Sequence, residues 1–348
     1  MGLFSSFVKG LGGVKGAVGS AYTSLHDAVT GRGQPGQAPM SSTTPAGSAV
    51  EPCPATDARA CPGVLSAAGQ QRANAKYDTL TLAGKQTMKI ALNGAQSPCE
   101  KAYIWKAFAA CHTPDECLTF GRTIAGKSDN WMKDNLSLTG DTHGRGVQQQ
   151  WSHSCNATTA QALRGQMDPI YALETRDRNP HMGTVDGLDA TRENPALAEE
   201  QRRMLTSNYT GGLGAMGGGT AVGRDQAGGS GRWADDLFNK SSDATGVTYS
   251  TMNPAADPTT QLDTGLATGA PVPIVIGNAP GEYTHYVLVT GSDAGPPKTY
   301  TVHDPWDGVT VTRTPAQMNG HINLAGSNQI TAVEEPTAIA RPAGRAPC

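Results

Sequence analysis

The chain has 348 residues, a formal net charge of −3 and a charged fraction of only 16%. It shows no basic cluster and no apolar run of about 20 residues, so we expect neither a nucleic-acid partner nor a membrane span. Its 43 glycines and 23 prolines make up about a fifth of the chain, which indicates long irregular segments.

The first 74 residues have the composition of a flexible tail followed by a linker. Residues 31–74 are rich in Gly, Pro, Ser, Thr and Ala and show no periodicity. The opening stretch MGLFSSFVKGLGG carries Lys9 among its apolar residues, so it lacks the continuous apolar core of a secretory signal. We expect this region to act as a tether, or as the address read by a delivery or secretion partner. The compartment stays open, with export by a specialised system as one option.

Residues 75–140 are predicted to form a helical subdomain. Apolar residues recur with mixed spacing over 76–94 and with helical spacing over 100–111. The tetrapeptide TPDE at 113–116 is a helix start, because its threonine can cap the helix and its glutamate can complete a capping box. A further short helix is expected over 128–136.

Seven cysteines allow several arrangements, and an odd count suits six paired thiols plus one free, reactive thiol. Cys53 with Cys61 would close a short loop. Cys111, His112 and Cys117 suggest zinc, but no second pair with ligand spacing follows them. We therefore expect no metal, and no nucleotide or flavin cofactor. The cysteines are Cys53, Cys61, Cys99, Cys111, Cys117, Cys155 and Cys348.

Residues 141–335 are predicted to form the main domain, in which a helix precedes a sheet. The segment CNATTAQALRGQM is typical of a helix with Cys155 in its first turn, and the dipeptide at 168–169 interrupts it. The short β-branched runs PVPIVIG, THYVLVTGSD, KTYTVHDPW, GVTVTR and NQITAV predict a largely antiparallel sheet, hence an α+β fold. The glycine-rich segment 211–231 is interpreted as an insertion, with a mobile lid as the alternative, and 336–348 as a loose tail.

Four residues in this domain have the order of a thiol hydrolase site. Gln149 precedes Cys155 by six positions, His285 follows it by 130, and Asp304 follows His285 by 19. Thiol hydrolases of the papain type place a histidine and an Asn or Asp at such distances from the nucleophile. In this chemistry the cysteine attacks, the histidine moves the proton, the acid orients the imidazole and the glutamine stabilises the oxyanion. Ser154 would cap the helix, whose positive end lowers the pKa of a thiol.

Three of the four positions have rivals. His153 is too close in sequence to approach the thiol from across a cleft, and His303 alternates in the wrong sense if Asp304 faces the site. A buried helix cysteine, an exposed histidine at a strand start and a turn-forming Asp-Pro are the plain alternatives. The rivals are Gln148 and Gln150 for the glutamine, His153 and His303 for the histidine, and Asp293 and Asp307 for the acid.

Over residues 145–312 the chain resembles bacterial papain-like cysteine peptidases of the double-glycine leader peptidase-like group. The likeness is carried by Gln149 with Cys155, by CNATTAQAL, by the apolar strand before the histidine, and by THYVLVTGSD and TVHDPWDG. It implies a papain-like fold, a protein or peptide substrate, and Cys155, His285, Asp304 and Gln149 as nucleophile, base, orienter and oxyanion donor. Family members often have Asp-Cys-Gly at the nucleophile, where this chain has Ser-Cys-Asn.

The same triad also serves other reactions, so alternatives remain open. Amidases, deamidases and transglutaminases share the cysteine nucleophile and differ only in leaving group or acceptor. With its long amino-terminal region the chain could be a toxin or effector of one of these kinds. A catalytically inactive papain fold used for binding is the remaining alternative.

Overall fold

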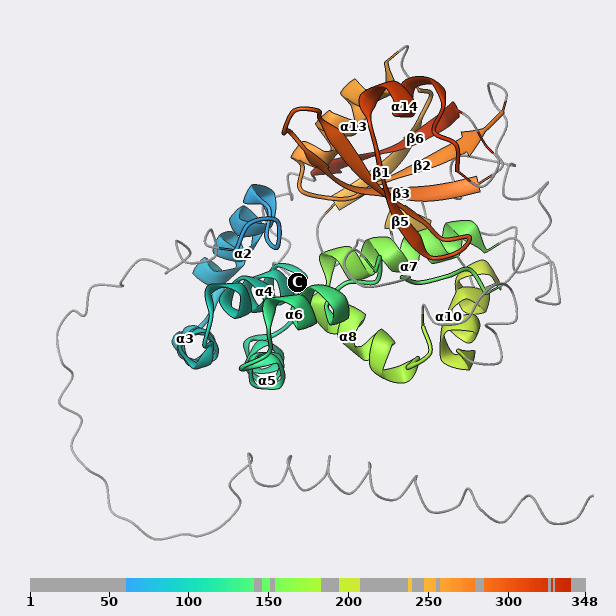
Figure 1. Cartoon of the computed structure of the whole chain (residues 1–348). Helices are drawn as coiled ribbons and strands as arrows, with labels where there is room; N and C mark the ends of the chain where they lie inside the picture. Colours follow the sequence, from blue (N-terminus) through green and yellow to red (C-terminus); the bar gives the residue numbers. More distant parts are fainter. Residues whose placement is uncertain are drawn as a thin grey trace, which may run out of the picture. The chain divides into compact units, whose positions relative to one another are not determined.

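Two units divide the chain, Met1–Pro52 and Cys53–Cys348, and all described residues belong to the second (Figure 1). The predicted tail up to residue 60, the glycine-rich segment 211–231 and the residues after 338 lie outside the described residues. The computed structural model describes residues 61–140, 146–150, 154–182, 194–206, 237–239, 247–254, 257–278, 285–324, 327 and 329–338.

Short helices packed on an apolar core of their own form the first part of this unit. Each begins after a serine or threonine whose hydroxyl accepts a hydrogen bond from a first-turn amide. Trp105 and Phe108 are almost fully buried in this core, with ring centroids 5.9 Å apart. The helices are α2 (Ala67–Thr79), α3 (Leu82–Gly94), α4 (Pro98–Ala109), α5 (Pro114–Ile124) and α6 (Asp129–Asn135).

The capping box expected at the start of α5 is confirmed. The Thr113 hydroxyl accepts a hydrogen bond from the Glu116 amide at 3.3 Å, and the Thr113 amide donates to the Glu116 carboxylate at 2.7 Å. Two of the amides that a helix start leaves without intrahelical partners are thereby satisfied.

The helical region begins earlier than predicted and is divided differently. Helix α2 begins at Ala67, inside the stretch that was assigned to the linker up to residue 74. The single helix expected over 76–94 is two helices, because Thr81 caps α3 instead of continuing α2.

Cys61 forms a disulfide with Cys99, so the suggested pairing of Cys61 with Cys53 is wrong.

The cysteines near the end of α4 do not form a metal site. Cys111 is disulfide-bonded, so it supplies no thiolate. Cys117 is free and buried, and burial raises the pKa of its thiol to about 12. Since Cys155 is free as well, the expectation of six paired thiols and one free thiol is wrong.

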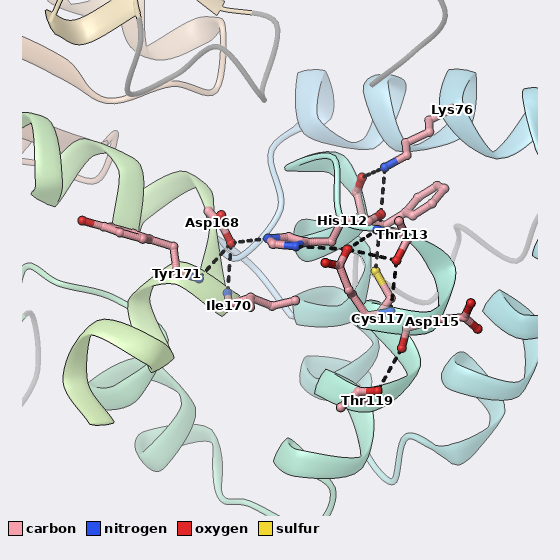
Figure 2. Close-up of polar contacts among 11 residues, drawn as sticks. Lys76, His112, Thr113, Asp115, Cys117, Thr119, Asp168, Ile170 and Tyr171 are labelled. Carbon is pink, nitrogen blue, oxygen red and sulfur yellow. Dashed lines mark hydrogen bonds and ion pairs between the residues drawn. The ribbon is translucent and has the colours of Figure 1, made fainter. Parts of the chain in front are cut away.

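A cluster of polar side chains joins the helical part to the start of helix α8 (Pro169–Arg178), as Figure 2 shows. The buried Lys76 donates to the carbonyl of Phe108 (3.2 Å), in the last turn of α4, and to that of His112 (2.8 Å), just after this helix. The His112 ring lies 2.9 Å from the Asp168 carboxylate. The same carboxylate oxygen accepts two first-turn amides of α8, so Asp168 caps this helix and holds His112 at once.

We expect the contact between His112 and Asp168 to stabilise the fold more strongly while the imidazole is protonated. Burial disfavours the charge, but the hydrogen bond to Asp168 and its negative charge outweigh burial and raise the pKa of His112 above its ordinary value. A raised folded-state pKa stabilises below the unfolded pKa, and this stabilisation is lost as pH rises through the folded pKa. His112→Gln should therefore lower the free energy of unfolding in urea more at about pH 5.5 than at about pH 8.5, by on the order of 1 kcal/mol.

His321→Gln is the matched control, since His321 is exposed. It should leave the difference in stability between the two pH values unchanged. An equal loss at both pH values in His112→Gln would contradict this account of the ion pair.

A six-stranded antiparallel sheet in the order β1-β6-β2-β3-β4-β5 forms the second part of the unit. All five predicted β-branched runs are strands of this sheet. Strand β1 was not predicted, and it pairs with β6 up to Ala338. Residues 336–338 are therefore a strand rather than part of the loose tail. The strands are β1 (Val247–Met252), β2 (Val272–Gly277), β3 (His285–Asp293), β4 (Thr299–Asp304), β5 (Val309–Arg313) and β6 (Gln329–Ala338).

Both faces of the sheet are covered by helices (Figure 1). Tyr286 and Leu288 of β3 belong to the apolar core that includes α7, while Val287 and Val289 belong to the core on the other face. This alternation is the period of two that a strand imposes on its side chains. The coarse α+β prediction is therefore confirmed. The helices are α7 (Cys155–Met167) against one face and α13 (Pro258–Ala267) and α14 (Pro315–Gly320) against the other.

None of the helices in the described part of the chain has the length and apolar character needed to cross a membrane.

Candidate functional site

Three of the four predicted site residues lie together where α7 meets the sheet. Cys155 is the first residue of α7, His285 is the first of β3, and Asp304 is the last of β4. The His285 Nε2 atom lies 2.7 Å from an Asp304 carboxylate oxygen, and the Cys155 thiol shares a hydrogen bond with the His285 side chain. Folding thus joins residues that are 130 and 19 positions apart into one hydrogen-bonded chain.

Helix α7 is positioned for this contact by its packing on β3. Ala157, Ala160 and Leu163 are fully buried in the core that they share with β3. In addition, the Thr159 hydroxyl donates to the carbonyl of Tyr286, the residue after His285, at 3.4 Å. The small alanines let the helix approach the strand closely, and its first residue therefore meets the strand's first residue.

Asp304 is held on two sides, which fixes its orientation toward the imidazole. His285 and Asp304 are buried, with 6% and 4% of their surface exposed. The Trp306 amide donates to the same Asp304 oxygen at 2.9 Å. Since the carboxylate engages Nε2 of His285, the Nδ1 atom is the ring nitrogen left for the Cys155 thiol.

The charges of the three residues depend on one another. Burial opposes ionisation of the Cys155 thiol, but its hydrogen bond with His285, the imidazolium charge and the amides of Tyr286 and Asn156 lower its pKa below the ordinary value. Burial also opposes the charge on His285, and hydrogen bonds with Asp304 and Cys155 raise its pKa well above the ordinary value. With one pKa lowered and the other raised, the contacts favour transfer of the thiol proton to the imidazole.

Gln149 lies in the buried segment 146–150, which runs beside the turn after β4 and is called the Gln149 segment below. Its amide donates to the carbonyl of Pro305 at 2.8 Å, so it is adjacent to the residue that follows Asp304. The Gly146 amide donates to Gly308 at 2.6 Å. Gln149 is therefore close to the triad in the fold, and its role as oxyanion donor stays a prediction.

The rival residues make other contacts. The fully buried His303 ring lies 3.1 Å from the Val147 carbonyl and 3.2 Å from the Thr310 hydroxyl, so it fastens the Gln149 segment to the sheet. Asp293 accepts the Gly295 amide at 2.9 Å, and Asp307 accepts the Val309 amide at 3.1 Å, as turn residues do. His153 lies outside the described residues.

The other two glutamines of the segment bind the backbone. Gln148 Nε2 donates to the Asp307 carbonyl at 2.9 Å, and Gln150 Nε2 donates to the Gln148 carbonyl at 3.0 Å. These contacts hold the segment in place beside the turn.

Gln201 of α10 (Pro195–Thr206) holds the Gln149 segment to α7, and sequence reasoning missed it. Its side chain is fully buried, and its oxygen accepts from the Gln150 amide at 2.7 Å and from the Ser154 hydroxyl at 2.9 Å. Its nitrogen donates to the Gln148 carbonyl at 2.9 Å and to Gln161 at 3.0 Å. Ser154 occupies the N-cap position of α7 as predicted, but its hydroxyl donates to Gln201 and makes no cap hydrogen bond.

We expect Gln201→Leu to destabilise the protein strongly. The substitution leaves the buried Gln150 amide and the buried Gln161 side-chain oxygen without the partner that Gln201 provides, and each orphaned group costs about 1–3 kcal/mol. Urea unfolding should therefore show a loss of about 2–5 kcal/mol. Arg202→Ala is the neighbouring control, since the side chains of Arg202 and its partner Glu199 are largely exposed and water screens their attraction. Equal losses in the two variants would rule out this role for Gln201.

No group of three or more His, Cys, Asp or Glu side chains in the described ranges is arranged to hold a metal ion. No model of a protein family matches the chain, and no curated protein sequence is significantly similar to it. The geometry of the site is therefore the basis for a functional assignment.

Proposed function

We propose that the chain is a papain-like cysteine peptidase that hydrolyses a peptide bond through a thioester on Cys155. The observation that carries this proposal is the hydrogen-bonded chain from the Cys155 thiol through His285 to Asp304. A helix-tip cysteine paired with a strand-borne histidine, which a carboxylate orients, is the arrangement that activates a thiol as a nucleophile. On this proposal the fold is papain-like, with α7 and the sheet providing the two sides of the site.

The reaction follows from the charge state of the pair. The Cys155 thiolate attacks the substrate carbonyl carbon, a carbon–sulfur bond forms, and the carbonyl electron pair moves to the oxygen. Collapse of this oxyanion breaks the carbon–nitrogen bond, and the His285 imidazolium gives its proton to the leaving amine. Water then attacks the thioester while His285 takes a proton from it, which releases the acid and restores the thiolate and imidazolium.

The oxyanion would form beside the start of α7 and the Gln149 segment. The amides of a first helical turn lack intrahelical acceptors, and Cys155 occupies this turn. We assign the Cys155 amide and the Gln149 side chain as the donors. The buried contacts of Gln201 with the residues on either side of Gln149 support this assignment, because an oxyanion donor must be held rigidly.

Mass spectrometry of a peptide mixture incubated with the full chain tests the proposal. Hydrolysis yields two fragments whose summed mass exceeds that of the parent peptide by one water. Deamidation would instead add about one dalton to an intact glutamine peptide, and transglutamination would join two peptides with loss of ammonia. Peptides left unmodified by the wild type and by Cys155→Ala alike would favour a binding function.

A further inference from the structure

A pocket of about 490 Å³ lies away from the triad, between α2, α4 and the sheet. Gln166 and Met167 at the carboxyl end of α7 border it, whereas Cys155 begins the same helix. A helix of 13 residues is about 20 Å long, so the pocket and the thiol are at opposite ends of α7. The pocket is therefore distinct from the proposed catalytic site.

Arg72 of α2 lines this pocket with a charge that the described part of the protein does not balance. Its Nε atom is buried and has no hydrogen-bond partner among the described residues. Its electrostatic partner is the Tyr249 phenol. This phenol donates to the Pro271 carbonyl at 2.9 Å, and because burial raises its pKa, the phenol stays neutral. Burial correspondingly lowers the pKa of Arg72.

Two further charged side chains line the pocket. Lys106 of α4 lines it as a second cation. Asp263 lines it as an acid, but its carboxylate pairs with Lys298 and accepts the Tyr300 hydroxyl at 2.9 Å. The carboxyl ends of α7 and α13 also border the pocket, and their carbonyls attract cations, yet none accepts a hydrogen bond from the Arg72 Nε.

We propose that this pocket binds a small organic anion, whose carboxylate or phosphate group pairs with Arg72 and Lys106. A guanidinium N–H that has been taken from water without an acceptor is costly, and the planar fork of N–H donors on Arg72 fits these two anionic groups. The apolar side chains of Leu65, Met167 and Leu266, which also line the pocket, provide a surface for an apolar body attached to the anion.

Calorimetric titration of the full chain with phenyl phosphate and with benzoate tests the proposal and tells phosphate from carboxylate recognition. Saturable binding of at least one probe is expected, with benzamide, the uncharged analogue, failing to bind. Arg72→Met and Lys106→Ala should each weaken binding about 10- to 100-fold, the usual effect of losing a hydrogen bond to a charged group. Arg122→Ala and Lys133→Ala remove exposed cations outside the pocket and should leave the affinity unchanged.

Melting temperatures of the variants without probe show whether Arg72→Met folds. We expect this variant to be at least as stable as the wild type, because it removes a buried N–H donor that has no acceptor among the described residues. Absence of saturable binding of both probes, equal binding of benzamide, or unchanged affinity in both pocket variants would each overturn the proposal.

Discussion

Replacing Cys155 by alanine is expected to abolish peptide hydrolysis, with kcat/KM lower by about 10³-fold or more, because the nucleophile of every later step is lost. His285→Ala should cause a loss of similar size, since without the imidazole the thiol keeps its proton and the leaving amine receives none. The two losses should not add in the double variant, because the residues act as one unit. Rates from a cleavable peptide, measured at matched folded concentrations, check this prediction.

Cys117→Ala is the control that this chain offers. Cys117 is the other free cysteine of the described residues, buried in the helical part with its pKa raised to about 12. Its loss should leave kcat/KM within about twofold of the wild type once folding is confirmed. Activity that survives in Cys155→Ala and disappears in Cys117→Ala would place the chemistry elsewhere.

Asp304→Asn should lower kcat by about 10²- to 10⁴-fold and also change its pH dependence. The Asp304 carboxylate, through its hydrogen bond and its charge, helps hold the pKa of His285 above the ordinary value. Without that charge the imidazolium loses its proton at lower pH. The alkaline limb of the pH–rate profile, which reports this deprotonation, should therefore move to lower pH.

Asp293→Asn provides the comparison, because Asp293 is an exposed acid near the end of the neighbouring strand. It should show the wild-type rate and the wild-type pH profile. A fall in kcat of Asp304→Asn without movement of the alkaline limb would mean that the carboxylate is structural and does not tune the imidazole.

The elements that could be predicted from sequence are those whose conformation is set by residues close to one another in the chain. The helix that begins at Cys155 ends where the Asp-Pro at 168–169 interrupts it, and the β-branched runs of β2 to β6 alternate between the two faces of the sheet. These patterns depend on neighbours in the chain. The sequence order of Cys155, His285 and Asp304 also indicated which side chains would meet.

The features that were missed depend on distant partners. Strand β1 is recognisable only from its pairing with β6, since VTYSTM has buried residues at just Val247 and Tyr249. The pairing of Cys61 with Cys99 follows from how α2 and α4 pack, and no spacing rule contains that information. Gln201 satisfies groups about 50 positions earlier, and a glutamine in an amphipathic helix carries no sequence signal for such a role.

The charge state of the resting thiol is measured most directly by the rate at which iodoacetamide alkylates Cys155 between pH 6 and pH 8, followed by peptide mapping. A thiolate paired with His285 should react at pH 6 within about threefold of its rate at pH 8, whereas an ordinary thiol slows by roughly 100-fold over this range. His285→Ala should restore the ordinary slope. A wild-type rate that falls with pH like that of a free thiol would contradict the activated pair on which the proposed peptidase depends.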